Sequence, residues 1–79
     1  MRVLYFAQAR LATTLSEENL EISSPLFAQN LWQELVRRHP KLADLQSSCR
    51  LARNGHFLKP GELLEPGDEV AVLPPVSGG

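Results

Sequence analysis

The sequence has few of the residues that several common kinds of functional site require. Cys49 is the only cysteine among 79 residues, which excludes an internal disulfide and a cysteine-based metal cluster within one chain. His39 and His56 lie far apart without a neighbouring set of ligands, so we expect exposed surface positions and no metal. Eight basic against nine acidic residues give a net charge of -1, which provides no basic field for nucleic acid or an anionic membrane.

Long hydrophobic runs are absent too. No stretch approaches the ~20 apolar residues of a membrane span, and the apolar run that starts at Val3 is too short for a signal peptide. Together with the single cysteine, this predicts a reducing, cytoplasmic location. A chain of 79 residues forms one domain with a small core and little room for an internal active-site cavity. We therefore expect a protein that serves as a substrate or partner for other proteins.

The first third of the chain contains two predicted strands. The apolar run Val3–Ala7 predicts strand one, and the alternating segment Asn19–Ser23 predicts strand two, with Leu20 and Ile22 facing inward. The segment between them, Gln8–Thr14, is expected to form a short helical turn or loop. The two strands should pair as a hairpin.

One long helix is predicted from Ser24 and Pro25 to about His39. Ser24 can cap free N–H groups, and Pro25 suits the first helical position because it has no N–H. Pro40 then ends the helix. The helix has one wide apolar stripe, which consists of Phe27, Ala28, Leu31, Trp32, Leu35 and Val36.

The second half of the chain contains short strands. Lys41–Ser48 is a connector, Cys49–Arg53 predicts strand three before an Asn54–Gly55 turn, Phe57–Leu58 is its short partner, and Asp68–Leu73 is the last strand. The order strand, strand, helix, short strands, strand predicts an α+β domain with one mixed sheet covered by one helix. This is the β-grasp pattern, in which the last strand lies parallel to the first.

The residues after the last strand form a distinctive ending, Pro74-Pro75-Val76-Ser77-Gly78-Gly79. The prolines hold the backbone near polyproline II, and the glycines can enter a channel too narrow for a side chain. We expect a globular domain over residues 1–73 and a flexible tail over 74–79 that carries a reactive carboxylate at Gly79. Six extended residues reach roughly 20 Å, although chain ends are also often simply frayed.

Three segments together resemble a known family. They are the opening Val3-Leu4-Tyr5-Phe6-Ala7-Gln8-Ala9-Arg10, the segment Gly67-Asp68-Glu69-Val70-Ala71, and the ending from Pro74 to Gly79. The chain resembles the small, sulfur-carrier subunits of molybdopterin synthase, within the ubiquitin-like sulfur carriers, over its whole length. Asn54-Gly55 stands where that family has an Asn-Gly turn, whereas Arg53 departs from the apolar residue that is more usual there.

The resemblance implies a β-grasp, ubiquitin-like fold and a non-catalytic subunit of a sulfurtransferase. An ionised carboxylate resists attack, so a partner adenylyltransferase would activate Gly79 with ATP and Mg²⁺, and a sulfur donor would leave a thiocarboxylate. The large subunit of molybdopterin synthase would then take the tail to the pterin precursor, in a heterotetramer of two small and two large subunits. No cofactor is expected to be bound by this chain itself.

The docking surface can be predicted from strand alternation. If Val3 faces the helix, Leu4 and Phe6 point to the opposite side of the sheet, and Ala71 and Leu73 do the same on the last strand. We expect Leu4, Phe6 and Leu73 to form a platform for both partners, extended by Pro75 and Val76. The alternative is that the connector after the helix covers this face.

Other residues have plainer interpretations. Cys49 could relay sulfur, but its apolar surroundings favour a core thiol. Trp32 is expected to be partly buried, and the charge runs Arg37-Arg38 and Glu17-Glu18 are typical of solvated faces. Arg10 matches the opening motif of the family without an assigned role.

Three other functions remain open at this point. The chain could be a ubiquitin-like modifier conjugated through Gly79, or a sulfur carrier of another pathway such as thiamin synthesis or tRNA thiolation. It could also be a plain β-grasp binding module with an inert tail. One alanine added after Gly79 would discriminate, since binding should survive while sulfur transfer is lost.

Overall fold

A computed structural model describes residues 1–75 of the chain. Its helices and strands, in chain order, are β1 (Arg2–Tyr5), α1 (Ala7–Thr13), β2 (Glu17–Asn19), β3 (Leu26–Phe27), α2 (Ala28–Arg38), the 3₁₀ helix η1 (Pro40–Asp44), β4 (Arg50–Arg53), β5 (His56–Phe57), β6 (Leu63–Leu64) and β7 (Glu69–Leu73).

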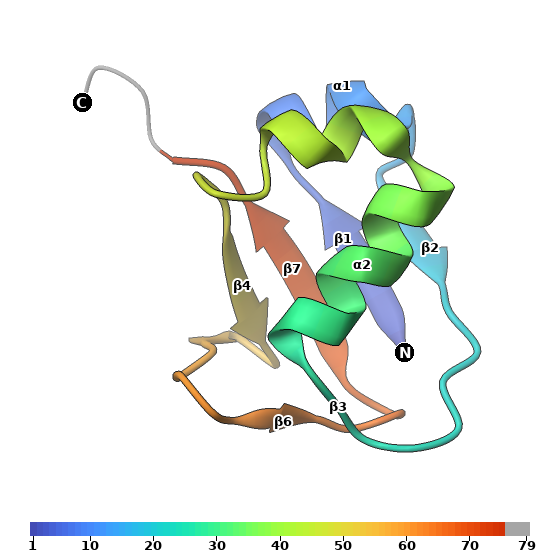
Figure 1. The fold of residues 1–79 in the computed structure, drawn as a ribbon, viewed down its shortest axis with the longest axis vertical. Coiled ribbons are helices and arrows are strands. Elements are labelled where there is room, and N and C mark those ends of the chain that lie inside the picture. Colours follow the sequence, from blue (N-terminus) through green and yellow to red (C-terminus); the bar gives the residue numbers. More distant parts are fainter. Residues whose placement is uncertain (76–79) are drawn as a thin grey trace.

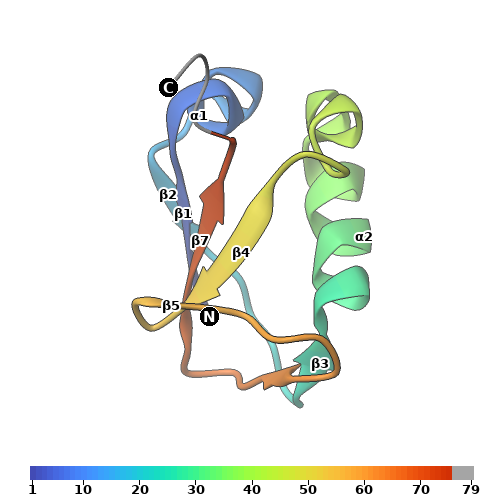
Figure 2. The same ribbon diagram turned by 90° about the vertical axis from the view of Figure 1, so that its left-hand side faces the viewer.

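Five strands form one mixed sheet in the order β2-β1-β7-β4-β5. β1 and β7 are parallel, and the other neighbouring pairs are antiparallel. α2 packs on one side of this sheet, and α1 lies at the end where β1 and β7 finish (Figures 1 and 2). This arrangement is the predicted β-grasp fold, with its two terminal strands paired at the centre.

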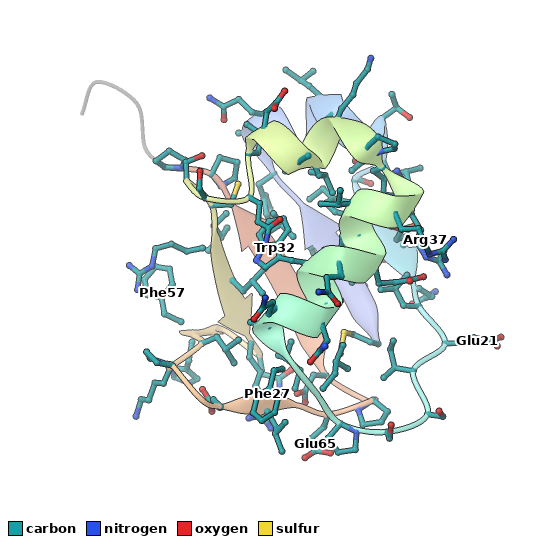
Figure 3. The ribbon with its side chains drawn as sticks, in the orientation of Figure 1. Glu21, Phe27, Trp32, Arg37, Phe57 and Glu65 are labelled. Atoms are coloured by element: carbon teal, nitrogen blue, oxygen red, sulfur yellow. The ribbon has the colours of Figure 1, made fainter. Side chains whose placement is uncertain are left out.

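The core lies between α2 and the sheet. Alternate residues of β1 and β7 point toward the helix: Val3, Val70 and Val72 are fully buried, and Tyr5 is 1% exposed. Leu31 and Leu35 of α2 meet them, and Trp32 is buried in the same cluster, as predicted. Figure 3 shows Trp32 directed from α2 toward the strands.

The long helix begins later than the sequence predicts. Leu26 and Phe27 pair with Leu64 and Leu63 as a small separate sheet, so α2 starts only at Ala28. The predicted start at Ser24 and Pro25 and the place of Phe27 on the apolar stripe are therefore wrong, and Phe27 is 51% exposed. Pairing with a strand far along the chain determines this boundary. The predicted end is confirmed, since α2 finishes at Arg38 before Pro40.

The first two strands also differ in their bounds. β1 ends at Tyr5 rather than Ala7, because Ala7 has a φ of 49° and turns the chain into α1. β2 ends at Asn19, two residues after its start, instead of running from Asn19 to Ser23. Leu20 nevertheless faces inward at 3% exposure, as predicted, and its N–H donates to the Met1 carbonyl at 2.8 Å.

The second half of the chain matches the prediction more closely. β4 and β5 flank the turn at Asn54 and Gly55, whose φ angles of 49° and 88° suit a two-residue hairpin. The 3₁₀ helix η1 occupies the start of the connector. β6 was not predicted, and it lies with β3 at the end of the molecule opposite the last residue of β7 (Figure 1). Within residues 1–75, no helix is both long and apolar enough to span a bilayer.

Candidate functional site

The side of the sheet that faces away from α2 has no helix over it in the described part of the chain; we call it the open face (Figure 2). Residues directly opposite each other in register share a face. Leu4 therefore lies beside Ala71, and Ala71 lies beside Ala52. Ala52 in turn lies beside Phe57. The apolar patch of this face consists of Leu4, Phe6, Ala52, Phe57, Ala71 and Leu73.

The structure brings the three predicted docking residues to this patch. Leu4 and Leu73 are half-buried by their neighbours, and Phe6 is 46% exposed. Phe6 follows the last residue of β1, and the turn at Ala7 keeps it at the mouth of a shallow hollow that Ala71 and Leu73 also line. The helical part of the connector, η1, packs against α2 and α1 and does not cover this face, whereas Ser48 at the end of the connector lines a hollow beside Leu73.

The start of the tail adjoins the patch. β7 ends at Leu73, after which Pro74 is half-buried and Pro75 is exposed. Both prolines line a second hollow, together with Leu73 and Phe57. Gly79, the predicted reactive residue, and with it Val76, Ser77 and Gly78, lie outside the described residues.

Sequence reasoning missed two members of the patch, Ala52 and Phe57. Phe57 is 52% exposed and lies beyond β4, at the edge of the sheet (Figure 3). The guanidinium carbon of Arg50 lies over its ring, 3.7 Å from the ring centre. The Asn54-Gly55 turn could have revealed that Ala52 and Phe57 share this face, because a two-residue hairpin fixes the register that places them opposite each other.

The end of the open face farthest from the tail is charged and internally paired. Arg2 donates from Nε to Glu17 at 2.7 Å and from Nη1 to Glu69 at 2.9 Å. The hydrogen bond from Arg2 and its charge lower the pKa of Glu17. All three side chains are about half exposed, so water and salt weaken these pairs.

A second polar cluster lies on the helix-covered side of the sheet. Glu18 accepts a hydrogen bond from the Tyr5 hydroxyl at 2.5 Å and one from Nε2 of His39 at 2.7 Å. The predictions of a solvated Glu18 and an exposed His39 are therefore wrong: each side chain is 16% exposed, because Glu18 stands opposite Val3 and faces α2.

Burial and hydrogen bonding both act on the pKa values of this cluster. Burial would raise the pKa of Glu18, but the hydrogen bonds from Tyr5 and His39 and the nearby charges outweigh it, so the pKa lies below the ordinary value. Burial and the bond to Glu18 raise the pKa of Tyr5. The cluster ties β1 and β2 to the end of α2 and contributes to the frame behind the open face.

Arg53 is accommodated by a third cluster rather than by apolar packing. Its Nε lies 2.7 Å from a carboxylate oxygen of the buried Asp68, and its Nη1 lies 3.1 Å from Glu62. Asp68 also accepts from the Asn54 side chain at 3.1 Å and from the Glu65 N–H at 2.8 Å. Burial would raise the pKa of Asp68, but these partners hold it below the ordinary value.

The remaining candidates assemble no catalytic group within residues 1–75. Cys49 is half-buried and packs against the core, and burial raises the pKa of its thiol, which keeps it protonated. The interpretation as a core thiol fits these surroundings. No three acidic, histidine or cysteine side chains of the described part lie close enough to hold a metal ion. What this part offers is a partly exposed apolar patch next to the start of the tail.

Comparisons with known proteins give one family and relatives that match the whole length of the chain. The ThiS family matches residues 3–79. The molybdopterin synthase sulfur carrier subunit of Homo sapiens is 38% identical over 82 residues, which cover 100% of this chain and 93% of that protein. The protein of the same name from Chlamydomonas reinhardtii is 35% identical, with coverage of 100% and 98%.

A solved structure shows the same fold. The small archaeal modifier protein 1 from Methanosarcina acetivorans superimposes with a TM-score of 0.76 at 27% sequence identity, over 99% of this chain and 94% of that one.

Proposed function

The chain belongs to the ThiS family, and within it to the molybdopterin synthase sulfur carrier subunits, and we propose that it carries sulfur as a thiocarboxylate on Gly79. The observation that carries the proposal is the full-length match to these subunits in a chain whose own last strand leads through two prolines into a diglycine. The globular domain is then the part of the chain that other proteins recognise.

The chemistry of the tail requires activation by another protein. An adenylyltransferase joins the Gly79 carboxylate to AMP from Mg²⁺-bound ATP, with release of pyrophosphate, and a sulfur donor then displaces AMP. We expect the adenylyltransferase, and not this chain, to bind the ATP and Mg²⁺. Its contribution is a backbone without side chains at the reacting end, so that the acyl carbon can enter a narrow active site.

The partner that consumes the sulfur is the large subunit of molybdopterin synthase, because the relatives are named as carrier subunits of that enzyme. The pterin precursor is reached only inside this complex, which we propose contains two small and two large subunits. The apolar patch on the open face serves as the platform for docking, since it adjoins the start of the tail. We place these events in the cytoplasm, where the single cysteine stays reduced.

Intact mass spectrometry tests the proposal directly. The chain is co-expressed with the adenylyltransferase and a sulfur donor, and we expect one oxygen of the chain to be replaced by sulfur. A control with one alanine added after Gly79 should fold and bind partners but gain no sulfur. An unmodified wild-type chain in the presence of active adenylyltransferase would refute the proposal.

The second candidate function is protein modification through an isopeptide bond. The structural likeness to the small archaeal modifier protein 1 favours this second candidate. Both functions begin with the same acyl-adenylate, but a modifier proceeds to a lysine of another protein. Conjugates of higher mass that disappear when Gly79 is blocked would support modification, whereas a free chain with one added sulfur supports the carrier.

A further inference from the structure

The cationic side chains of this protein differ in how they are neutralised. Arg2, Arg37, Arg38 and Arg53 each contact at least one carboxylate. Within residues 1–75, Arg50 has no such partner, and neither do Arg10, Lys41 and Lys59. What distinguishes Arg50 is that its guanidinium rests on the Phe57 ring. Arg50 is thus an exposed charge without a counter-charge in the described part of the chain.

The missing counter-charge matters because Arg50 lies beside the start of the tail. Arg50 opens β4 directly opposite Leu73, the last residue of β7, and lines the same hollow as Pro74 and Pro75. A protein that takes the tail into its interior must come to rest against this hollow, because the tail spans only roughly 20 Å from Pro74 to Gly79 when fully extended. Docking on the open face therefore removes water from the Arg50 guanidinium.

Burial of a guanidinium without an acceptor is costly, whereas a carboxylate can take two of its five N–H groups in parallel. The stacking on Phe57 limits the motion of the guanidinium before the partner arrives, so less conformational freedom is lost when a bond forms. The opposite end of the open face, where Glu17 and Glu69 exceed Arg2 in charge, would disfavour the reversed orientation of an acidic partner surface.

We propose that Arg50, held on Phe57, is a specificity-determining residue that pairs with a carboxylate of the large synthase subunit beside the entrance for the tail. This inference rests on the proposed function, because it takes the large subunit as the occupant of the open face. The ion pair of Arg50 determines which end of the apolar patch lies beside the entrance for the tail in the large subunit. The apolar patch supplies most of the contact area.

The test compares matched variants by calorimetry with the large subunit of the same organism. Arg50→Met keeps a long stem and removes the charge, Arg50→Lys keeps the charge without the planar fork, and Lys41→Met removes an exposed charge from η1, away from the open face. We expect Arg50→Met to weaken binding about tenfold, Arg50→Lys to weaken it less, and Lys41→Met to leave it unchanged. The wild-type affinity should fall with added salt, and Arg50→Met should reduce that dependence.

Each result separates this inference from the proposed function. Wild-type affinity and salt dependence in Arg50→Met would overturn the role of Arg50, although sulfur transfer to the pterin would still stand. A loss of affinity for the adenylyltransferase alone would overturn the choice of partner. Failure of the wild-type chain to gain sulfur would refute the proposed function, and with it this inference. Circular dichroism of each variant checks that the fold is intact.

Discussion

The two sides of one sheet differ more than any other two regions of this molecule. On β1 and β7, the residues that face α2 are at most 1% exposed, whereas their neighbours on the open face remain half-buried or exposed. The same strands thus carry a packed core on one side and a partly exposed apolar surface on the other.

Because of this difference, residues that are neighbours in the sequence contribute to different properties of the protein. The covered side pairs Glu18 with Tyr5 and His39 inside the fold, while Glu17, its neighbour in sequence, pairs with Arg2 in contact with water. Substitutions on the covered side should therefore change the free energy of unfolding, and substitutions on the open face should change partner binding. Four substitutions test this division.

The largest effect is expected at the centre of the covered side. Leu35 is fully buried, so Leu35→Ala leaves a cavity and should lower the free energy of unfolding by about 2–5 kcal/mol. The matched control is Leu11→Ala on α1, where the side chain is 78% exposed and the change should stay within about 0.5 kcal/mol. Urea unfolding followed by circular dichroism measures both. Equal losses in the two variants would contradict the assigned core.

Phe6→Ala should produce the opposite pattern. Phe6 is 46% exposed, so its removal should cost less than about 1 kcal/mol of stability. If the patch docks the large subunit, the same change should weaken that binding about thirtyfold, or roughly 2 kcal/mol, because aromatic anchors dominate interfaces. Calorimetric titration of the two proteins measures the loss. An unchanged dissociation constant would remove Phe6 from the interface.

Sequence reasoning recovers this two-sided design only in part, for physical reasons. Alternation along Val3–Ala7 and the last strand identified the inward residues and four members of the patch, because the period of a strand is a local property. The start of α2 could not be found in the same way. It depends on the pairing of Leu26 with Leu64, which lies 38 residues away in the chain.

Polar clusters were missed for a related reason. Glu18 and His39 look like surface residues in the sequence, and only the register of β2 on β1 turns Glu18 toward the helix. The stacking of Arg50 on Phe57 likewise requires the β4–β5 hairpin to form first.

Glu18→Gln should have an intermediate effect on stability. Glutamine keeps an acceptor oxygen but loses the charge that two donors share, so we expect a loss of about 1 kcal/mol at neutral pH. Because the folded pKa of Glu18 lies below the ordinary value near 4.5, its contribution is complete above that value and is lost as the pH falls through the folded pKa. Unfolding measured from pH 7 to pH 3 should therefore show a shallower acid dependence in the variant. A wild-type acid profile in Glu18→Gln would contradict the role of the cluster.

Glu17→Gln, one position earlier on β2, should produce the smallest effect of the four. The pKa of Glu17 is also lowered, by its hydrogen bond from Arg2, but the pair is solvated and about half exposed, so the net gain from pairing is small. The unfolding midpoint should match that of the wild type within error at physiological salt, and any difference should appear only at low ionic strength. A loss as large as that of Glu18→Gln would mean that pairing on the open face contributes to the fold as much as pairing under α2. In that case the side on which a carboxylate lies would not determine its contribution to stability.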